Sequence, residues 1–455
     1  MNSLCRLKEW FNLHCTQVQE EYFQWLRFAS ISADVQYAKD MRACALWVRD
    51  YLAKYTQMTS CLIETTGQPI VFAEDLRAGP AAPTVLIYGH YDVQPVDPLE
   101  LWTSPPFEPT MRDGKVYARG ALDDKGQIFY AVVAMRALHE LIGPLSVNVK
   151  LCIEGEEESA SQGLEMALSQ LKGTLQADAI LVVDFGQFDE VTPAITLGAR
   201  GLVALEVTLT GSNSDLHSGE HGGLAYNPNR AMVELLAKLW GSQGYIQVDG
   251  FYDDVVEASA DLRQQIDFAL EPKSYQKTFG VGALGGERGR TMAENNFFRP
   301  TLEINGIGGG YFGAGVKTVI PAHCTAKISC RLVPNQDPKK IEQKLIEFLK
   351  SHVVAGMQIA FHSFGGAPAF RGSSDSFLAK AIAKAAEEVN GRACKKVLCG
   401  ASIPIIAKLA KELEADVVGM GYGLATDNIH APNEHFDMSR FEKGFLTLGR
   451  AIELL

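Results

Sequence analysis

Acidic and imidazole side chains recur at the ends of apolar segments along this chain, in a combination that could hold two metal ions. They occur in the motifs VLIYGHYDVQP, YARGALDDKG, LCIEGEEES, ILVVDFG and TDNIHAPNE. Hard carboxylates mixed with imidazoles, without thiolates, favour Zn or Mn over an iron–sulfur cluster or a structural zinc site. Such a site holds water as hydroxide near neutral pH, so hydrolysis is the first hypothesis. The candidate residues are His90, Asp92, Asp123, Glu157, Glu158, Asp184 and His430.

His90 and Asp92 follow an apolar run in the motif GHYD. Residues two apart on a strand face the same side, so Asp92 can hydrogen-bond one ring nitrogen of His90 and fix its tautomer. The competing interpretation is a loop histidine beside a turn aspartate.

The pair Asp123 and Asp124 precedes a segment that is expected to be helical. Acids are stabilised at a helix N-terminus, and this is a strong alternative to metal binding. The two interpretations are compatible, because one aspartate can cap the helix while the other bridges two ions.

Three consecutive acids, Glu156, Glu157 and Glu158, end an apolar strand. Three adjacent like charges are costly unless they are solvated or neutralised, so a solvated acidic loop is the alternative to a site. In a site, one glutamate ligates a metal while its neighbour stays free as general base. Asp184 follows four apolar residues and needs a partner if it is buried. His430 lies in a polar loop.

Length and composition set the broad class. At 455 residues the chain is expected to form two domains, and 47% hydrophobic with 21% charged residues is typical of globular proteins. A formal net charge of −12 argues against nucleic acid or an anionic membrane as a partner. The nine cysteines are scattered and form no CxxC pair, and neither a signal peptide nor a membrane span is predicted. We therefore expect a cytoplasmic protein with reduced thiols.

Periodicity divides the chain into two kinds of segment. Residues 1–55 read as helical, and strands then alternate with helices, which implies a sheet covered on both faces. The pattern changes near residue 198, where about four strands and two helices predict a small α+β unit. After residue 365 the α/β pattern resumes. The predicted first domain therefore comprises residues 1–198 and 365–455, with residues 199–364 inserted. Specific predictions are one strand over residues 318–333 and a polar, irregular stretch over residues 249–290.

Several longer motifs resemble the M20 metallopeptidase family, and specifically its dipeptidase branch, which includes carnosine dipeptidase-like and bacterial enzymes. They are GHYDVQPVDPLELWTSPPFEP, DGKVYARGALDDKGQ, DLHSGEHGG, GVKTVIPAHCTAKISCRLVPNQDP and DNIHAPNE. They occur in the family's order, and the resemblance runs from about Ile31 to the end of the chain.

The resemblance implies a role for each candidate residue. His90 and Asp184 would bind one metal, Glu158 and His430 the other, and Asp123 would bridge the two. Glu157 would be the general base, and Asp92 would orient His90. His217 would stabilise the oxyanion from the partner subunit of a homodimer. Arg331 would hold the C-terminal carboxylate of the substrate, with Thr318 and Ser402 as further substrate contacts.

The fold implied by the resemblance is a zinc-exopeptidase-type α/β domain, with a mixed sheet covered by helices and an inserted ferredoxin-like lid and dimerisation domain. Two divalent ions are expected per subunit, zinc in the first place and manganese as the alternative. The substrate would be a small peptide. Two departures from the family pattern stand out. Ala160 replaces a common glycine, and Ser374 or Asp375 lies where the dipeptidase branch often has a second substrate-binding histidine.

The predicted function is hydrolysis of the amide bond of dipeptides. The nearest alternative is an N-acyl-amino-acid deacylase of the acetylornithine or succinyl-diaminopimelate type, which would use the same metals. A non-catalytic binding module is less favoured, because every expected metal and base position is filled. A magnesium-dependent phosphohydrolase is disfavoured by the two histidines and by the lack of a phosphate-binding loop.

Overall fold

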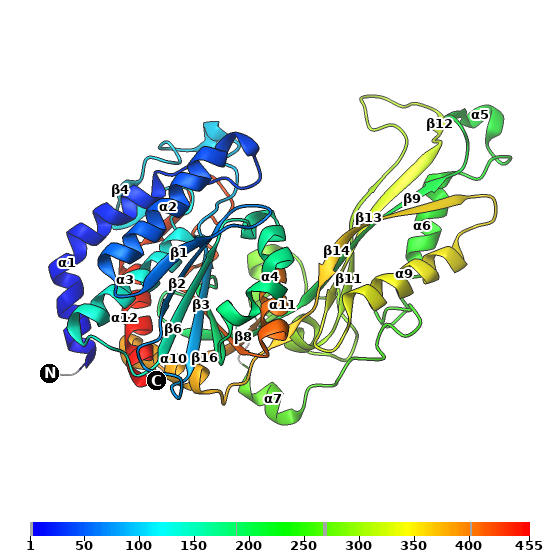
Figure 1. Cartoon of the computed structure of the whole chain (residues 1–455). Coiled ribbons are helices and arrows are strands. Elements are labelled where there is room, and N and C mark those ends of the chain that lie inside the picture. The colour runs from blue at the N-terminus through cyan, green and yellow to red at the C-terminus, as the bar shows by residue number, and fades with distance from the viewer. Residues whose placement is uncertain (1–2, 188, 267–270, 401–402) are drawn as a thin grey trace.

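The protein has two bodies, one built on a large sheet and one on a small sheet (Figure 1). The computed structural model describes residues 3–187, 189–266, 271–400 and 403–455. In Figure 1 the large sheet, with both chain termini, lies on the left, and the small sheet extends away from it on the right. No helix among the described residues has both the length and the apolar character that crossing a bilayer requires.

The large sheet has nine strands within the described residues, in the order β1-β2-β6-β3-β7-β17-β8-β15, with β16 paired to β8. Its centre is parallel, since β3 pairs in parallel with both β6 and β7, and β7 pairs in parallel with β17. The strands are β1 (Thr59–Ile63), β2 (Ile70–Asp75), β3 (Thr84–His90), β6 (Asn148–Glu154), β7 (Ala179–Val182), β8 (Ala194–Ala199), β15 (Phe370–Arg371), β16 (Lys395–Cys399) and β17 (Asp416–Met420). The central strands are buried, as their continuous apolar runs predict.

Helices cover both faces of this sheet. One face packs in a single apolar core with α1 (Ser3–Leu26), α2 (Ala38–Tyr55), α3 (Lys125–Leu141), α10 (Phe377–Asn390) and α12 (Met438–Leu454). The opposite face forms a second core with α4 (Gln162–Leu175) and α11 (Pro404–Leu413). The predicted α/β class with a doubly covered sheet is confirmed.

The small sheet is antiparallel and has the strand order β11-β13-β9-β14. Its elements follow one another along the chain as β9 (Gly201–Thr210), α6 (Pro228–Ala237), β11 (Thr301–Gly308), β13 (His323–Leu332), α9 (Pro338–His352) and β14 (Gln358–Ala367). This βαββαβ order with both helices in one core is the ferredoxin-like arrangement. β9 alternates between buried and half-buried residues, as a strand with one covered face should.

Two sequence predictions in this region differ from the structure. The single strand expected over residues 318–333 is two strands, β12 (Val319–Ile320) and β13, and β12 pairs instead with β10 (Leu216–His217). Pro321 lies between them and has no N–H group to continue a ladder. The stretch expected to be irregular, residues 249–290, contains the short helices α7 (Ala260–Gln265) and α8 (Pro272–Phe279).

The remaining elements are short. β18 (His435–Asp437), β5 (Lys115–Tyr117) and β4 (Thr110–Arg112) form a three-stranded sheet beside the large one. The helix α5 (Ser218–His221) follows β10 at the far tip of the small-sheet body (Figure 1). Single helical turns lie at Val35–Tyr37, Leu99–Leu101, Glu157–Ser159 and Glu294–Phe298.

Two adjacent segments join the bodies. The chain leaves the large sheet after β8, enters β9 at Gly201, and returns from β14 into β15. Leu202 pairs with Ala367, and Ala199 pairs with Phe370, so the outgoing and returning segments run side by side. A Cβ atom on Gly201 would lie 2.6 Å from the carbonyl oxygen of Ala367, which accounts for glycine at this crossing. The predicted boundaries at residues 198 and 364 stay predictions.

Candidate metal centre

Three neighbouring strands of the large sheet bring distant acids and a histidine to one edge. β6, β3 and β7 are adjacent and parallel, so the segments that follow them emerge at the same side. His90 is the last residue of β3, Asp184 comes shortly after β7, and Glu157 begins a helical turn after β6. The topology therefore gathers residues that are almost one hundred positions apart.

Asp123 lies between the two predicted ligand histidines. Its Oδ1 atom is 3.1 Å from Nε2 of His90, and its Oδ2 atom is 2.8 Å from Nε2 of His430. His90 is fully buried, whereas the side chain of His430 is half exposed. One carboxylate thus contacts an imidazole with each oxygen, as a group that bridges two cations would.

Further carboxylates surround each histidine. Oε1 of Glu158 is 3.2 Å from Nε2 of His430, and Oδ2 of Asp184 is 3.7 Å from Nε2 of His90. Glu157 is farther away, with Oε2 at 4.0 Å from the same nitrogen of His90. Two groups of donor atoms each gather within 4.8 Å, namely His90 with Asp124 and Asp184, and Asp123 with Glu158 and His430.

Asp92 is a fully buried carboxylate that joins two parts of the centre. Its Oδ1 atom is 3.2 Å from Nδ1 of His90, the ring nitrogen that faces away from Asp123. The same carboxylate accepts hydrogen bonds from the backbone N–H groups of Glu157 and Glu158, at 3.2 and 3.1 Å. Asp92 therefore holds both the imidazole of His90 and the turn that carries the glutamates.

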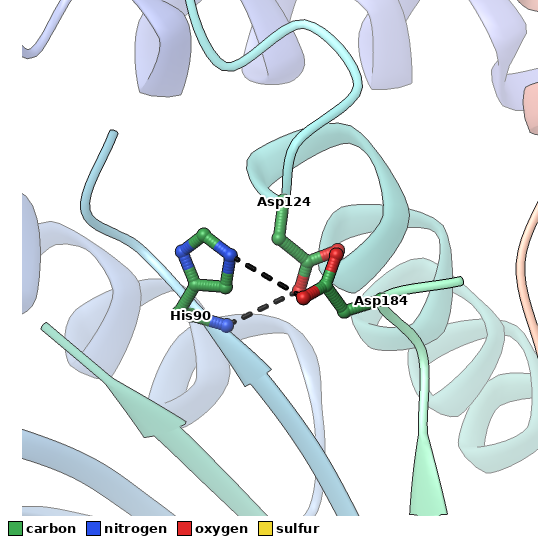
Figure 2. A group of neighbouring side chains, drawn as sticks. All are labelled: His90, Asp124 and Asp184. Carbon is green, nitrogen blue, oxygen red and sulfur yellow. Dashed lines mark hydrogen bonds and ion pairs between the residues drawn. The ribbon is translucent and has the colours of Figure 1, made fainter. Parts of the chain in front are cut away.

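Asp124 lies inside the centre rather than capping the following helix. It occupies the N-cap position of α3, but its side chain makes no capping hydrogen bond. Figure 2 shows its carboxylate beside that of Asp184, both directed toward His90. Oδ2 accepts a 3.1 Å hydrogen bond from the backbone N–H of His90. Oδ1 is buried and has no hydrogen-bond donor among the described residues. The sequence interpretation assigned no metal contact to Asp124.

The charges of the centre fit bound cations. Burial, with repulsion from Asp123 and Asp124, raises the pKa of Asp184 well above its usual range. Burial also raises the pKa of Glu157 to about 7. Hydrogen bonds to Asp123 and Glu158 raise the pKa of His430 to about 10. So many acids in a buried space require positive charge, which divalent ions would supply in place of imidazole protons.

Two polar residues that the sequence interpretation missed also contact the centre. The hydroxyl of Ser32, after α1, donates to Oδ2 of Asp92. The amide of Gln94 donates a 2.8 Å hydrogen bond to Oε2 of Glu158. Gln94 is four residues after His90, so in an extended segment both side chains face the same side, and this spacing could have identified Gln94. Nothing in the sequence relates Ser32 to the site.

The remaining predicted residues lie away from this cluster. His217, in β10, and Thr318, beside β12, belong to the far tip of the small-sheet body (Figure 1). Nδ1 of His217 accepts a hydrogen bond from the N–H of Gly219. Arg331, on β13, lines a cavity of about 410 Å³ together with Arg200. Ser402 lies outside the described residues.

Comparisons with known proteins agree with the geometry. A 32% identical relative over 379 residues is the Cys-Gly metallodipeptidase dug1 of Schizosaccharomyces pombe, with 80% of this chain and 78% of the relative covered. The human Beta-Ala-His dipeptidase is 30% identical, with 83% of this chain and 75% of the relative covered.

Solved structures confirm the predicted zinc-exopeptidase-type fold. The M20 family metallo-carboxypeptidase Sso-CP2 from Sulfolobus solfataricus superposes with a TM-score of 0.86 at 31% identity, covering 96% of this chain and 98% of that one. Human carnosine dipeptidase 1 superposes with a TM-score of 0.80 at 26% identity, covering 100% and 99%. The family model for Peptidase family M20/M25/M40 matches residues 86–454. The chain therefore belongs to peptidase family M20/M25/M40.

Proposed function

We propose that this M20 peptidase hydrolyses the amide bond of dipeptides with two divalent cations. The observation that carries the proposal is the Asp123 carboxylate, which places one oxygen against His90 and the other against His430. Relatives that are about 30% identical bear dipeptidase names, which favours this activity over the N-acyl-amino-acid deacylase alternative.

In the proposed assignment, His90 and Asp184 hold one ion, Glu158 and His430 hold the other, and Asp123 lies between them. Asp124 is a further candidate ligand beside His90, because its Oδ1 atom is buried without a donor. A donor set of carboxylates with two imidazoles favours zinc, with manganese as the alternative. Bound ions of this kind lower the pKa of water and polarise a peptide carbonyl.

Glu157 is the proposed general base. Its Oε2 atom lies 4.0 Å from Nε2 of His90, close to the centre but farther away than the proposed ligands. The carboxylate would accept a proton from the attacking water and then transfer it to the leaving amine. Asp92 would keep the ring of His90 in one orientation through its contact with Nδ1.

Substrate contacts are proposed for residues of the small-sheet body. Arg331 would pair with the C-terminal carboxylate of the peptide, for which a guanidinium fork is suited. Thr318 and Ser402 would contribute further contacts, and His217 would stabilise the oxyanion. Because the tip that carries His217 extends away from the metal centre (Figure 1), we propose that the partner of a homodimer supplies it. The cytoplasm is the proposed location, consistent with nine cysteines that form no disulfide bond within the described residues.

Carboxypeptidase action on longer peptides is the second candidate. The likeness to the metallo-carboxypeptidase Sso-CP2, at 31% identity and a TM-score of 0.86, favours it. Both activities would use Arg331 in the same way. A carboxypeptidase site must leave room for peptide residues beyond the second residue from the carboxyl end, whereas a dipeptidase site need not.

Metal analysis combined with a substrate panel tests the proposal. Purified protein should contain two divalent ions per chain, and chelation should abolish turnover. Dipeptides should be hydrolysed faster than tripeptides, dipeptide amides and N-acetyl amino acids. Faster cleavage of tripeptides would support the carboxypeptidase, and cleavage of N-acetyl amino acids alone would support the deacylase. Dipeptide hydrolysis at the full rate by chelated, metal-free protein would contradict the mechanism.

A further inference from the structure

A buried glutamate lies just outside the proposed ligand set. Glu434 is four residues after His430, and its side chain is fully inaccessible to solvent. It lies on the loop that carries His430, yet its carboxylate points into the loop that carries Asp123. None of the roles proposed above uses it.

Four donors from the Asp123 loop converge on this carboxylate. Oε1 accepts from the backbone N–H groups of Leu122 and Asp123, at 2.9 and 3.1 Å. Oε2 accepts from the N–H of Gly120 at 3.0 Å and from Nη1 of Arg119 at 2.8 Å. Both oxygens are thus used, and one bond reaches the backbone of Asp123 itself.

The two loops diverge at Glu434. On one side of Glu434 the two segments are paired strands, because β18 pairs with β5 and the N–H of Ala118 donates to the carbonyl of Glu434 at 3.2 Å. On the other side of Glu434 the two segments meet through side chains, where Oδ2 of Asp123 lies 2.8 Å from Nε2 of His430. The Glu434 carboxylate spans the gap between these two contacts.

We propose that Glu434 is a positioning residue that fixes the spacing between Asp123 and His430. This inference rests on the proposed metal centre. Metal affinity depends on ligand atoms that are held at the coordination distance before the ion arrives. Glu434 provides that restraint for one ion, because it fixes the backbone of Asp123 relative to the chain segment of His430.

A carboxylate suits this place because both of its oxygens accept hydrogen bonds. Four donors face it, and a carboxylate offers acceptor sites on both oxygens. A glutamine offers one oxygen, so its NH2 group would face either the guanidinium of Arg119 or two backbone N–H groups. Glu434→Gln therefore removes part of the restraint at almost unchanged volume.

The test compares Glu434→Gln with a matched control, Glu21→Gln. Glu21 is also buried and paired with an arginine, Arg136 at 3.1 Å, but it lies between helices outside the metal centre. Zinc affinity is measured by competition with a chromophoric chelator. We expect Glu434→Gln to lose about 10- to 100-fold in affinity for one of two ions, and Glu21→Gln to stay within about twofold. At saturating zinc, Glu434→Gln should lower kcat and leave KM within about twofold.

A second variant changes the guanidinium contact and leaves the backbone contacts in place. Arg119→Lys keeps a cation near Oε2 and leaves the three backbone N–H bonds in place. We expect its zinc affinity to stay within about threefold of the unsubstituted protein. Equal losses in Arg119→Lys and Glu434→Gln would assign the effect to the guanidinium contact and overturn the proposal. Unchanged zinc affinity in Glu434→Gln would overturn it as well.

Hydrogen exchange of the unsubstituted protein tests the proposal if the variants do not fold. The amides of Leu122 and Asp123 should be as well protected as those of the buried strands, also after chelation. Exchange at the rate of exposed loops would overturn the proposal. The zinc-affinity and hydrogen-exchange readouts are independent of substrate, so a zinc-loaded protein that cleaves no peptide would count against the proposed function alone.

Discussion

The hydroxyl of Ser32 donates a 2.6 Å hydrogen bond to Oδ2 of Asp92, the carboxylate beneath His90. The backbone segments of the two residues also meet here, because the N–H of Val93 donates a 2.9 Å hydrogen bond to the carbonyl of Ser30. The chain that follows the first helix thus supports the metal centre, although it precedes the family match, which begins at residue 86.

Replacing Ser32 by alanine should weaken the metal centre without unfolding the protein. Asp92 would keep its contacts to His90 and to the glutamate turn but lose one neutral donor. We expect a decrease of about tenfold in zinc affinity, the lower end for residues that support metal ligands. Chelator competition measures it, with Ser60→Ala as control, because Ser60 donates to the carbonyl of Arg49 outside the centre. Equal affinities of the two variants would refute this role.

Glu157→Gln should retain the metals and lose turnover. A general base must be ionised, so activity should rise with pH as Glu157 loses its proton. Burial raises the pKa of Glu157 to about 7, and bound cations stabilise its ionised form, so the acidic limb should lie at or below about pH 7. Metal content and a pH profile of kcat/KM check both points. A variant with normal turnover would remove Glu157 from the mechanism.

Mixing two inactive variants tests the proposed homodimer. His217→Ala and Glu157→Ala should each be inactive alone. After subunit exchange, half of the dimers are mixed, and one of two sites in each has both residues intact, so about a quarter of the activity should return. Light scattering establishes the oligomeric state. Absence of recovery after verified exchange would show that His217 does not act across subunits.

Asp75→Asn should destabilise the protein at neutral pH. Burial alone would raise the pKa of Asp75, but hydrogen bonds from Arg77 and His139 lower it from 3.8 to about 2. A lowered carboxyl pKa stabilises the folded state above about pH 4, and this contribution disappears as the pH falls through 2. We expect a loss of about 2 kcal/mol at pH 7 and a smaller difference at pH 3, measured by urea unfolding. Asp50→Asn, at an exposed ion pair with Arg49, should change stability by less than about 0.5 kcal/mol.

Much of the centre could be predicted because its residues follow strands. His90 and Asp184 stand after apolar runs, and alternation of strands with helices implies parallel neighbours whose ends meet. Asp124 could not be assigned in this way, because an acid before a helix predicts a cap equally well. Ser32 and Glu434 are polar loop residues whose partners are fixed only by tertiary packing.

The strands that the sequence patterns did not predict are short or lie at sheet edges. β1 includes Thr59 and Ser60, and β16 begins with two lysines, so neither strand presents a continuous apolar run. The strand expected over residues 318–333 has a regular apolar pattern and is broken only by Pro321. Hydrophobic periodicity indicates which residues are buried. A break in the hydrogen-bond ladder of a strand depends instead on whether each residue has a backbone N–H group to donate.

The paired crossing beside Gly201 is the point about which any rotation of one body against the other would take place. Arg331 lies close to this crossing, opposite Leu202, whereas His217 lies at the far tip of the small-sheet body (Figure 1). Displacement in a rotation grows with distance from the pivot, so a few degrees at this crossing would shift His217 far more than Arg331. In the proposed dimer, such a rotation would move the imidazole that each chain offers to its partner's site, while Arg331 would stay almost in place.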